Sequence, residues 1–288
     1  MRRKTTDVRI GNVVLSSEEP VLVQSMLNTS TREVDACVEQ AIRIIEAGGR
    51  LVRITAPGVK EAEMLGEIHR RLRERGYTTP ISADIHFVAE AASVAARYVE
   101  KVRINPGNFA DKRATFKKLT YTDEEYAAEL EILRQKFTEF LEVCRQYGTA
   151  VRIGTNHGSL SDRIMSRYGD TPAGMVEATM EYLRVCQACD FKDVVISLKS
   201  SDCRTMVDAV RLLVEKMEAE GMCYPLHLGV TEAGEGEDGR IRSAVGIGTL
   251  LNEGIGDTIR VSLTEEPEAE IPVACELARI CSEPEYLK

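Results

Sequence analysis

Long apolar runs are absent from this 288-residue sequence. A transmembrane helix needs about 20 consecutive, mainly apolar residues, so the sequence predicts no membrane-spanning helix. The basic N-terminus, residues 1–6, is not followed by the short apolar segment that a secretory signal peptide carries. We therefore expect a cytoplasmic protein with no membrane partner.

An excess of basic residues is also lacking. The chain has 37 Lys and Arg residues against 46 Asp and Glu residues, for a formal net charge of −9. Nucleic acids are bound through a basic surface, because their phosphate backbone is anionic. The sequence thus predicts no nucleic-acid partner.

The cysteine pattern gives no disulfide framework, which fits a reducing compartment. The eight cysteines lie at positions 37, 144, 186, 189, 203, 223, 275 and 281. One CxxC pair, Cys186 and Cys189, falls late in an amphipathic helical pattern. A metal site needs further ligands, and no second pair is near. We interpret these two residues as buried helix cysteines.

Strand-like and helix-like segments alternate along the chain. Short β-branched runs bounded by turn residues occur eight times, at residues 21–26, 51–55, 81–86, 102–105, 150–154, 194–198, 226–230 and 258–262. Helical patterns fill the gaps, and the last of them covers about residues 268–281. Eight strands with intervening helices in a chain of this length predict an α/β fold, the (β/α)8 TIM barrel.

Two additions to the barrel are expected. Residues 8–15 have the pattern of an N-terminal hairpin with a turn at Gly11-Asn12, which is suited to cover the bottom of a barrel. Residues 109–148 form an elaborated crossover between the fourth and fifth strands, with a capping box at 122–125 that begins a helix. No linker interrupts the chain, so we predict a single domain over residues 1–288.

Alternation along the strands predicts which side chains point into the barrel, because neighbouring residues of a strand face opposite sides. Four strands place an arginine between two aliphatic residues that must face the helices. The predicted inward residues are Arg53, Arg103, Arg152 and Arg260, Asp84 and His86, Ser197 and Lys199, and His227, Gly229 and Thr231.

This set contains more cations than acids. Five cationic side chains converge, whereas the expected acids are Asp84 and, at the rim, Glu232. One interpretation is a set of structural ion pairs. The imbalance disfavours it, because an unpaired buried charge costs several kcal/mol. Arginine matches phosphate oxygens in a bidentate fashion, so the set favours a phosphate or diphosphate ligand.

The segments that follow the strands support a site at the carboxyl ends, where barrel enzymes bind their substrates. Residues 105–108 and 154–160 are rich in turn residues, and Glu232 follows the seventh strand. Near arginines Glu232 would be an ionised clamp or base, and in a sheltered place a proton donor; a structural ion pair is an equal alternative. The G-x-G-x-x-G match at 234–239 carries three acids and opens no βαβ unit, so we reject a dinucleotide site there.

Several motifs along the chain resemble those of one enzyme family. Residues 23–26, 102–108, 152–160, 227–234 and 256–263 are together similar to the 4-hydroxy-3-methylbut-2-enyl diphosphate synthases. The similarity covers essentially the whole chain. Residues 159–172 resemble the longer form of the family, found in plants and some bacteria, in which an extra domain follows the barrel.

The resemblance implies a reaction and a set of residues. The substrate would be 2-C-methyl-D-erythritol 2,4-cyclodiphosphate, which is reduced through a [4Fe–4S] cluster with ferredoxin or flavodoxin as the electron donor. Glu232 matches the acid proposed for proton transfer. We expect substrate contacts from Arg53, Asp84, His86, Arg103, Asn105, Arg152, Asn156, Ser197, Lys199, His227, Arg260 and Ser262.

One departure from the family pattern is plain. Family members hold the cluster with three cysteines and a glutamate in a C-terminal iron–sulfur domain, and nothing here matches that site. We expect this chain to be the barrel part alone, with no cluster or other metal of its own and no turnover by itself. The cluster domain would come from the same or another chain.

Two other functions remain as alternatives. One is a pterin-binding barrel of the dihydropteroate synthase kind, which the cationic interior disfavours and which pterin binding would restore. The other is a non-catalytic barrel that binds a phosphorylated metabolite, for which replacing Glu232 would have no consequence.

Overall fold

The strands form a closed parallel barrel. The computed structural model describes residues 2–86, 88–111 and 120–282. The strand order is β8-β7-β6-β5-β4-β3-β10-β9, and a bridge between Ile196 and Leu226 joins the two ends of this series. The strands are β3 Leu22–Met26, β4 Leu51–Thr55, β5 Ile81–Asp84, β6 Lys101–Ile104, β7 Ala150–Asn156, β8 Val194–Lys199, β9 His227–Leu228 and β10 Thr258–Ile259. All eight predicted strands are confirmed.

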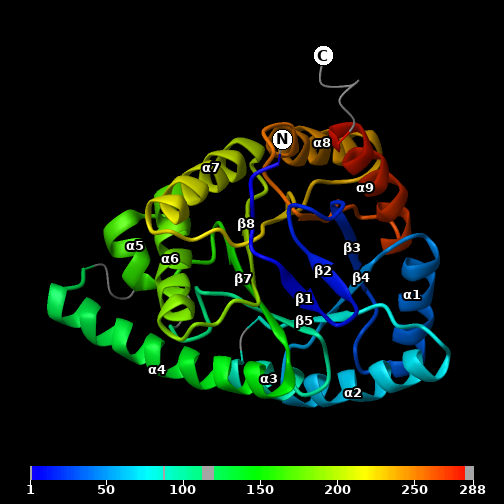
Figure 1. Ribbon diagram of the computed structural model, residues 1–288, viewed down its shortest axis with the longest axis horizontal. Coiled ribbons are helices and arrows are strands. Elements are labelled where there is room, and N and C mark those ends of the chain that lie inside the picture. The colour runs from blue at the N-terminus through cyan, green and yellow to red at the C-terminus, as the bar shows by residue number, and fades with distance from the viewer. Residues whose placement is uncertain (1, 87, 112–119, 283–288) are drawn as a thin grey trace.

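The helices cover the outside of the barrel, as Figure 1 shows. They are α1 Val34–Glu46, α2 Val59–Glu74, α3 Ala89–Ala95, α4 Asp123–Tyr147, α5 Asp162–Tyr168, α6 Pro172–Ala188, α7 Cys203–Ala219, α8 Gly236–Asn252 and α9 Pro267–Ser282. None of the helices in the described part of the chain is long and apolar enough to cross a membrane.

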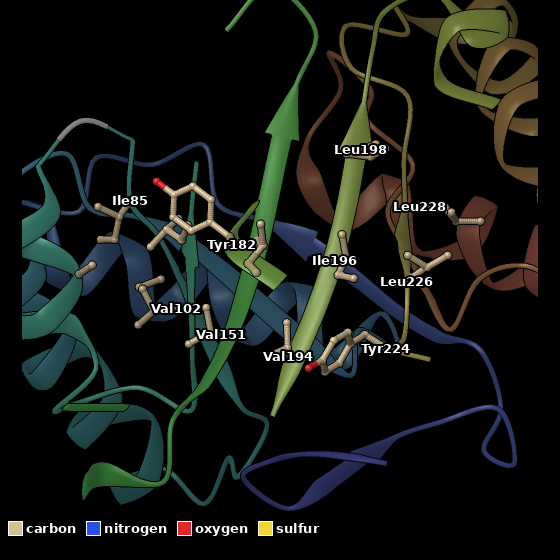
Figure 2. Close-up of a cluster of buried hydrophobic side chains, with 14 of the residues drawn as sticks. Ile85, Val102, Val151, Tyr182, Val194, Ile196, Leu198, Tyr224, Leu226 and Leu228 are labelled. Carbon is tan, nitrogen blue, oxygen red and sulfur yellow. The ribbon is translucent and has the colours of Figure 1, made fainter. Parts of the chain in front are cut away.

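The main hydrophobic core lies between strands and helices. Val194, Ile196 and Leu198 alternate along β8, are at most 1% exposed and point to the same side (Figure 2). Tyr182 of α6 packs in the same core and is 1% exposed. Because the aliphatic residues of each strand face outward, the residues between them face the barrel interior.

A hairpin closes the bottom of the barrel. β1 Val8–Ile10 pairs with β2 Val13–Leu15, and the turn residue Gly11 has φ +58°, a conformation that glycine adopts without strain. Figure 1 shows this hairpin across the end of the barrel. Its apolar residues form one cluster with the lowest interior layer, Leu22, Leu51, Ala150 and Val195. The predicted plug is confirmed, and a ligand must enter from the opposite end.

The predicted crossover contains one long helix. α4 begins with a reciprocal capping box, in which Thr122 Oγ1 accepts from Glu125 N–H and Glu125 Oε2 accepts from Thr122 N–H. It ends at Gly148, with φ +67°. The capping box was predicted. Residues 112–119 of the crossover lie outside the described residues.

The CxxC pair belongs to the end of α6. Cys186 is fully buried, and Cys189 lies half-buried directly after the helix. Burial raises the pKa of the Cys186 thiol well above its usual value, which disfavours the thiolate that a metal needs. The interpretation as a buried helix cysteine is confirmed for Cys186, whereas Cys189 is the C-cap residue of α6 and is only half-buried.

Candidate functional site at the barrel mouth

Asp84 is the centre of the interior charges. Its Oδ1 lies 3.0 Å from Arg103 Nη1, and its Oδ2 lies 3.3 Å from Arg53 Nε and 3.3 Å from His86 Nε2. Burial acts to raise the pKa of Asp84, but Arg53, Arg103 and His86 together hold it well below its usual value. Asp84 is therefore a buried carboxylate shared by two arginines from neighbouring strands.

Arg53 and Arg103 have further partners that fix their direction. The Arg53 guanidinium also contacts Met26 Sδ, at 3.0 Å from Nε, and Arg103 Nη2 donates to Gly154 O at 2.7 Å. Burial, together with Arg260 and Arg103, lowers the pKa of Arg53 to about 10 against the opposing effect of Asp84. With this pKa, Arg53 is cationic at neutral pH.

Arg152 and Lys199 have no carboxylate partner among residues 2–86, 88–111 and 120–282. Arg152 is 2% exposed and Lys199 7% exposed, and the polar contact of Arg152 is from Nη1 to Ser197 Oγ at 3.3 Å. Burial lowers the pKa of both groups well below the usual values, and the neighbouring arginines add to this effect. These two cations are the ones for which an anionic ligand would have most effect.

Arg260 has a partner that the strand pattern did not predict. Its Nε and Nη2 each lie 3.0 Å from one oxygen of Glu270, a residue of α9 that is 1% exposed. Glu270 also accepts from Ser25 Oγ at 2.6 Å and from Leu263 N–H at 3.1 Å. The strand pattern therefore missed one buried acid of the site, Glu270. Its signal, an acid on the buried face of the last helix, lay outside the strands.

Two inward glycines provide room for the cations. A Cβ at Gly154 would lie 2.5 Å from Arg103 Nε, and one at Gly229 would lie 2.8 Å from Lys199 Nζ and 3.0 Å from Arg260 O. Any larger residue would displace these groups. The two glycines therefore leave the space that the side chains of Arg103 and Lys199 occupy in the barrel interior.

The two turn-rich segments at the mouth are joined. Asn105 donates from Nδ2 to Ser159 Oγ at 3.0 Å and accepts from Gly107 N–H at 3.1 Å. A Cβ at Gly107 would lie 1.7 Å from Ser159 O, so only glycine permits this approach. The Asn105 amide therefore holds the two loops together, and Asn156, half-buried at the end of β7, lies beside this junction.

The rim carries Glu232 in an unusual conformation. Its φ is +52°, one of two positive values at non-glycine residues of the described chain, and its side chain is exposed. It makes no ion pair with a described residue, so the structural ion-pair alternative finds no support. A strained backbone at the barrel mouth points to a functional role, because folding alone does not favour this conformation. Ser262 lies half-buried just after β10.

His227 lies deeper than the mouth. It is 0% exposed, and its Nδ1 lies 3.0 Å from Gln24 Nε2. Burial and the charges of Lys199 and Arg152 lower its pKa well below the usual value, so it is neutral. The predicted inward direction is correct, but its depth places the mouth charges between it and the rim.

A cavity of about 1010 Å³ opens at the carboxyl ends of β3, β4 and β10. Met26, Thr55 and Arg260 line it, together with residues 27–32 and 263–265. Ligand pockets commonly have volumes of roughly 300–1,000 Å³. The cavity lies beside the cations, and Arg260 belongs to both.

A resident metal site is not formed by the residues that the structure describes, because they contain no group of three or more His, Cys, Asp or Glu side chains suited to hold one. Three of the eight cysteines are buried, and no three of them are placed to hold a metal together in the described part of the chain. They do not fit an iron–sulfur cluster, which needs several thiolates converging on one place.

A closed barrel with a cationic interior and a strained acid at its rim defines the class: a TIM-barrel domain with its site at the carboxyl ends of the strands. Residues 5–275 match the model of the GcpE TIM-barrel domain, and the chain belongs to that family.

Curated relatives agree with this assignment. The 4-hydroxy-3-methylbut-2-en-1-yl diphosphate synthase (flavodoxin) of Parabacteroides distasonis is 64% identical over 276 residues, covering 96% of this chain and 45% of that protein. The chloroplastic (ferredoxin) enzyme of Arabidopsis thaliana is 52% identical over 280 residues, covering 97% of this chain and 38% of that protein. The chain spans less than half the length of these relatives.

Solved structures share the fold at low identity. The dihydropteroate synthase of Stenotrophomonas maltophilia has a TM-score of 0.62 and 13% identity, covering 99% of this chain and 100% of that one. The enzyme of Yersinia pestis has a TM-score of 0.61 and 12% identity, covering 96% and 99%. At this identity the likeness shows the barrel architecture alone.

Proposed function

We propose that this chain is the substrate-binding barrel of an enzyme that converts 2-C-methyl-D-erythritol 2,4-cyclodiphosphate to 4-hydroxy-3-methylbut-2-enyl diphosphate in the non-mevalonate pathway of isoprenoid synthesis. The observation that carries the proposal is the charge imbalance at the mouth. Five cationic side chains converge there with two buried carboxylates, Asp84 and Glu270. A cyclic diphosphate brings two negative charges on adjacent phosphates.

Arg152 and Lys199 are the principal ligand cations in this proposal. Arg53 and Arg103 are held by Asp84, and Arg260 by Glu270, so these three have fixed directions before a ligand arrives. Preorganised donors bind a phosphate without further ordering, and each charged hydrogen bond contributes about 1.5–3 kcal/mol. Ser197, through Arg152, positions one of the two unpaired cations.

The rim residues complete the contacts. Asn156 ends β7, whereas His86 and Ser262 follow the ends of β5 and β10, and all three present polar groups at the mouth. Asn105 acts on the ligand through the loop junction that it holds. Glu232 stands where a proton can be passed between solvent and a bound ligand. In the proposed reaction a hydroxyl leaves as water, and that step consumes a proton.

The electrons come from outside this chain. We propose that an iron–sulfur domain of the same or another chain holds a [4Fe–4S] cluster over the mouth, with ferredoxin or flavodoxin as donor, in line with the names of the relatives. The described residues offer no cluster ligands, so this barrel binds and orients the substrate and supplies protons.

The activity test uses the full-length protein with its cluster assembled. With a chemical reductant and the cyclic diphosphate, it should form the allylic diphosphate, detected by mass spectrometry. Glu232→Gln should reduce the rate at least about 100-fold, as loss of a general acid does. Glu235→Gln, an exposed acid at the start of α8, is the matched control and should leave the rate unchanged.

An unchanged rate in Glu232→Gln would favour the non-catalytic barrel instead. The pterin alternative makes a different prediction, saturable pterin binding with no competition from the cyclic diphosphate. The family match and the cationic interior both favour the diphosphate.

A further inference from the structure

One lysine of the barrel interior lies below the mouth cations. Lys101 begins β6, two residues before Arg103, and therefore points inward with it. Its side chain is 0% exposed. Its Nζ has no hydrogen-bond partner among the described residues, and no carboxylate of those residues lies within ion-pair distance.

Other buried polar atoms of the barrel interior lack partners among the described residues too. They are Ser82 Oγ on the neighbouring strand, Gln24 Oε1, His227 Nε2 and the Nε atoms of Arg103 and Arg152. The apolar layer of the hairpin closes the barrel beneath these atoms. Buried polar groups are nearly always hydrogen-bonded to protein or to ordered water, so we expect ordered water beside these atoms.

No hydrogen bond of the described residues compensates the burial of the Lys101 ammonium group. Its Cα neighbours across the sheet are Ser82 and Ala150, which offer no charge. A hydrocarbon side chain of the same length would fill the space without the cost of burying an ammonium group, several kcal/mol for an unpaired ion. A buried lysine kept under these conditions indicates a role in binding or catalysis.

The charges that face Lys101 oppose its ammonium form. Arg152 of β7 and Arg53 of β4 repel it, Asp84 of β5 attracts it, and the facing His227 of β9 is neutral. Burial is the largest effect and, with the two arginines, brings the pKa of Lys101 well below its usual value. An anion-free mouth therefore disfavours the ammonium form of Lys101 relative to a lysine in water.

We propose that Lys101 is a further binding residue of the anion site, acting on a bound diphosphate from below through ordered water and taking up a proton when the dianion enters. This rests on the proposed function only in that the ligand is a polyanion. Two negative charges near Arg152 and Arg53 offset the repulsion that these arginines exert on Lys101. Proton binding and anion binding then favour each other by the same factor.

The first test measures proton uptake on binding. The cyclic diphosphate is titrated calorimetrically into this chain near pH 7 in buffers of different ionisation enthalpy, whose heats report the protons exchanged. The native chain should take up a large part of one proton. Lys101→Met should lose this uptake and bind roughly tenfold more weakly, the order expected for one charge acting through water. Lys192→Met, at an exposed lysine, is the matched control and should behave as native.

Equal uptake in the native chain and in Lys101→Met would overturn the proposal, because the proton would then go elsewhere. No uptake in either would overturn it as well. A merely structural lysine would instead lower the melting temperature when replaced, whereas the proposal predicts that ligand-free Lys101→Met melts at the same or a higher temperature.

A second measurement needs no ligand and separates this proposal from the proposed function. The Cε carbon shift of Lys101, followed by NMR in the ligand-free chain, reports whether the amine or the ammonium is present. The amine near pH 7 supports the proposal even if the cyclic diphosphate fails to bind, and a different polyanion, inorganic pyrophosphate, then becomes the probe. The ammonium form would contradict it whatever binds.

Discussion

Glu270 of α9 holds Arg260, the residue directly after β10, in a two-pronged ion pair, with both N–O distances 3.0 Å. The pair joins the last helix to the last strand of the barrel, and it directs the guanidinium toward the mouth cavity. Because Glu270 is 1% exposed and also accepts from Ser25 and Leu263, it is the anchor of this side of the site.

Replacing that anchor should weaken the fold. Glu270→Gln leaves Arg260 without its counter-charge, and breaking a buried pair in this way costs about 3–5 kcal/mol. Denaturant unfolding of the ligand-free chain measures the loss. Glu268→Gln removes the partly exposed partner of Arg43 and should cost less than about 1 kcal/mol. Equal losses in the two variants would show that Glu270 is not an anchor.

The ionisation of Asp84 should make the stability of the protein depend on pH. Its pKa in the folded chain lies well below the value in an unfolded chain, so the folded state binds fewer protons. The stabilisation is fully present above about pH 4, the unfolded pKa, and is lost as the pH falls through the folded value.

Asp84→Asn should therefore lower the free energy of unfolding by about 3–5 kcal/mol near neutral pH, and by less as the pH falls below about 4. The same variant removes a negative charge from the mouth, so its affinity for a polyanion should rise if it folds. Asp35→Asn, at an exposed acid, is the control and should change neither quantity appreciably. A pH-independent difference between Asp84→Asn and the native chain would contradict the assigned ionisation.

Gly229 should be needed for the position of Lys199. In Gly229→Ala the new Cβ would lie 2.8 Å from Lys199 Nζ, so the ammonium must move away from its place in the mouth. We expect anion affinity to fall roughly tenfold, the cost of weakening one charged contact. Gly248→Ala introduces a methyl group no closer than 3.6 Å to its nearest neighbour and serves as the control. Native affinity in Gly229→Ala would show that Lys199 does not touch the ligand.

The conformation of Glu232 allows function to be separated from stability. Glu232→Gly relieves a positive φ and should stabilise the ligand-free chain by up to about 1–2 kcal/mol, while the full-length enzyme loses its activity. Asp190→Gly relieves a similar φ of +47° outside the mouth and should stabilise without loss of activity. If both variants keep full activity, the role proposed for Glu232 is wrong.

The sequence predicted the barrel and the direction of its charges because alternation has only two phases. In Val102-Arg103-Ile104 the aliphatic residues must face the helices, so the arginine must face the interior, as observed. The same rule, applied two residues earlier, predicts that Lys101 also points inward, although Lys101 was not among the predicted inward residues.

The alternation rule could not predict how deep a side chain lies in the barrel, or which partners the helices supply to it. Alternation predicts which face of a strand a side chain occupies, but not its height along the barrel axis. His227 was therefore expected among the ligand contacts at the mouth, whereas it is fully buried. Glu270 comes from a helix, whose approach to a strand depends on the loop between them. The loop contact of Asn105 with Ser159 joins segments 54 residues apart, which local pattern does not reveal.

Calorimetric titration of this chain with 2-C-methyl-D-erythritol 2,4-cyclodiphosphate, beside Arg152→Ala, tests the central claim most directly. Arg152 has no acid to satisfy it among the described residues, so its replacement should leave the fold intact and reduce affinity by about 100-fold or more, whereas Arg204→Ala, at an exposed arginine, should bind as native. Saturable binding that Arg152→Ala loses is the predicted result. Equal binding by the native chain and Arg152→Ala would contradict the account.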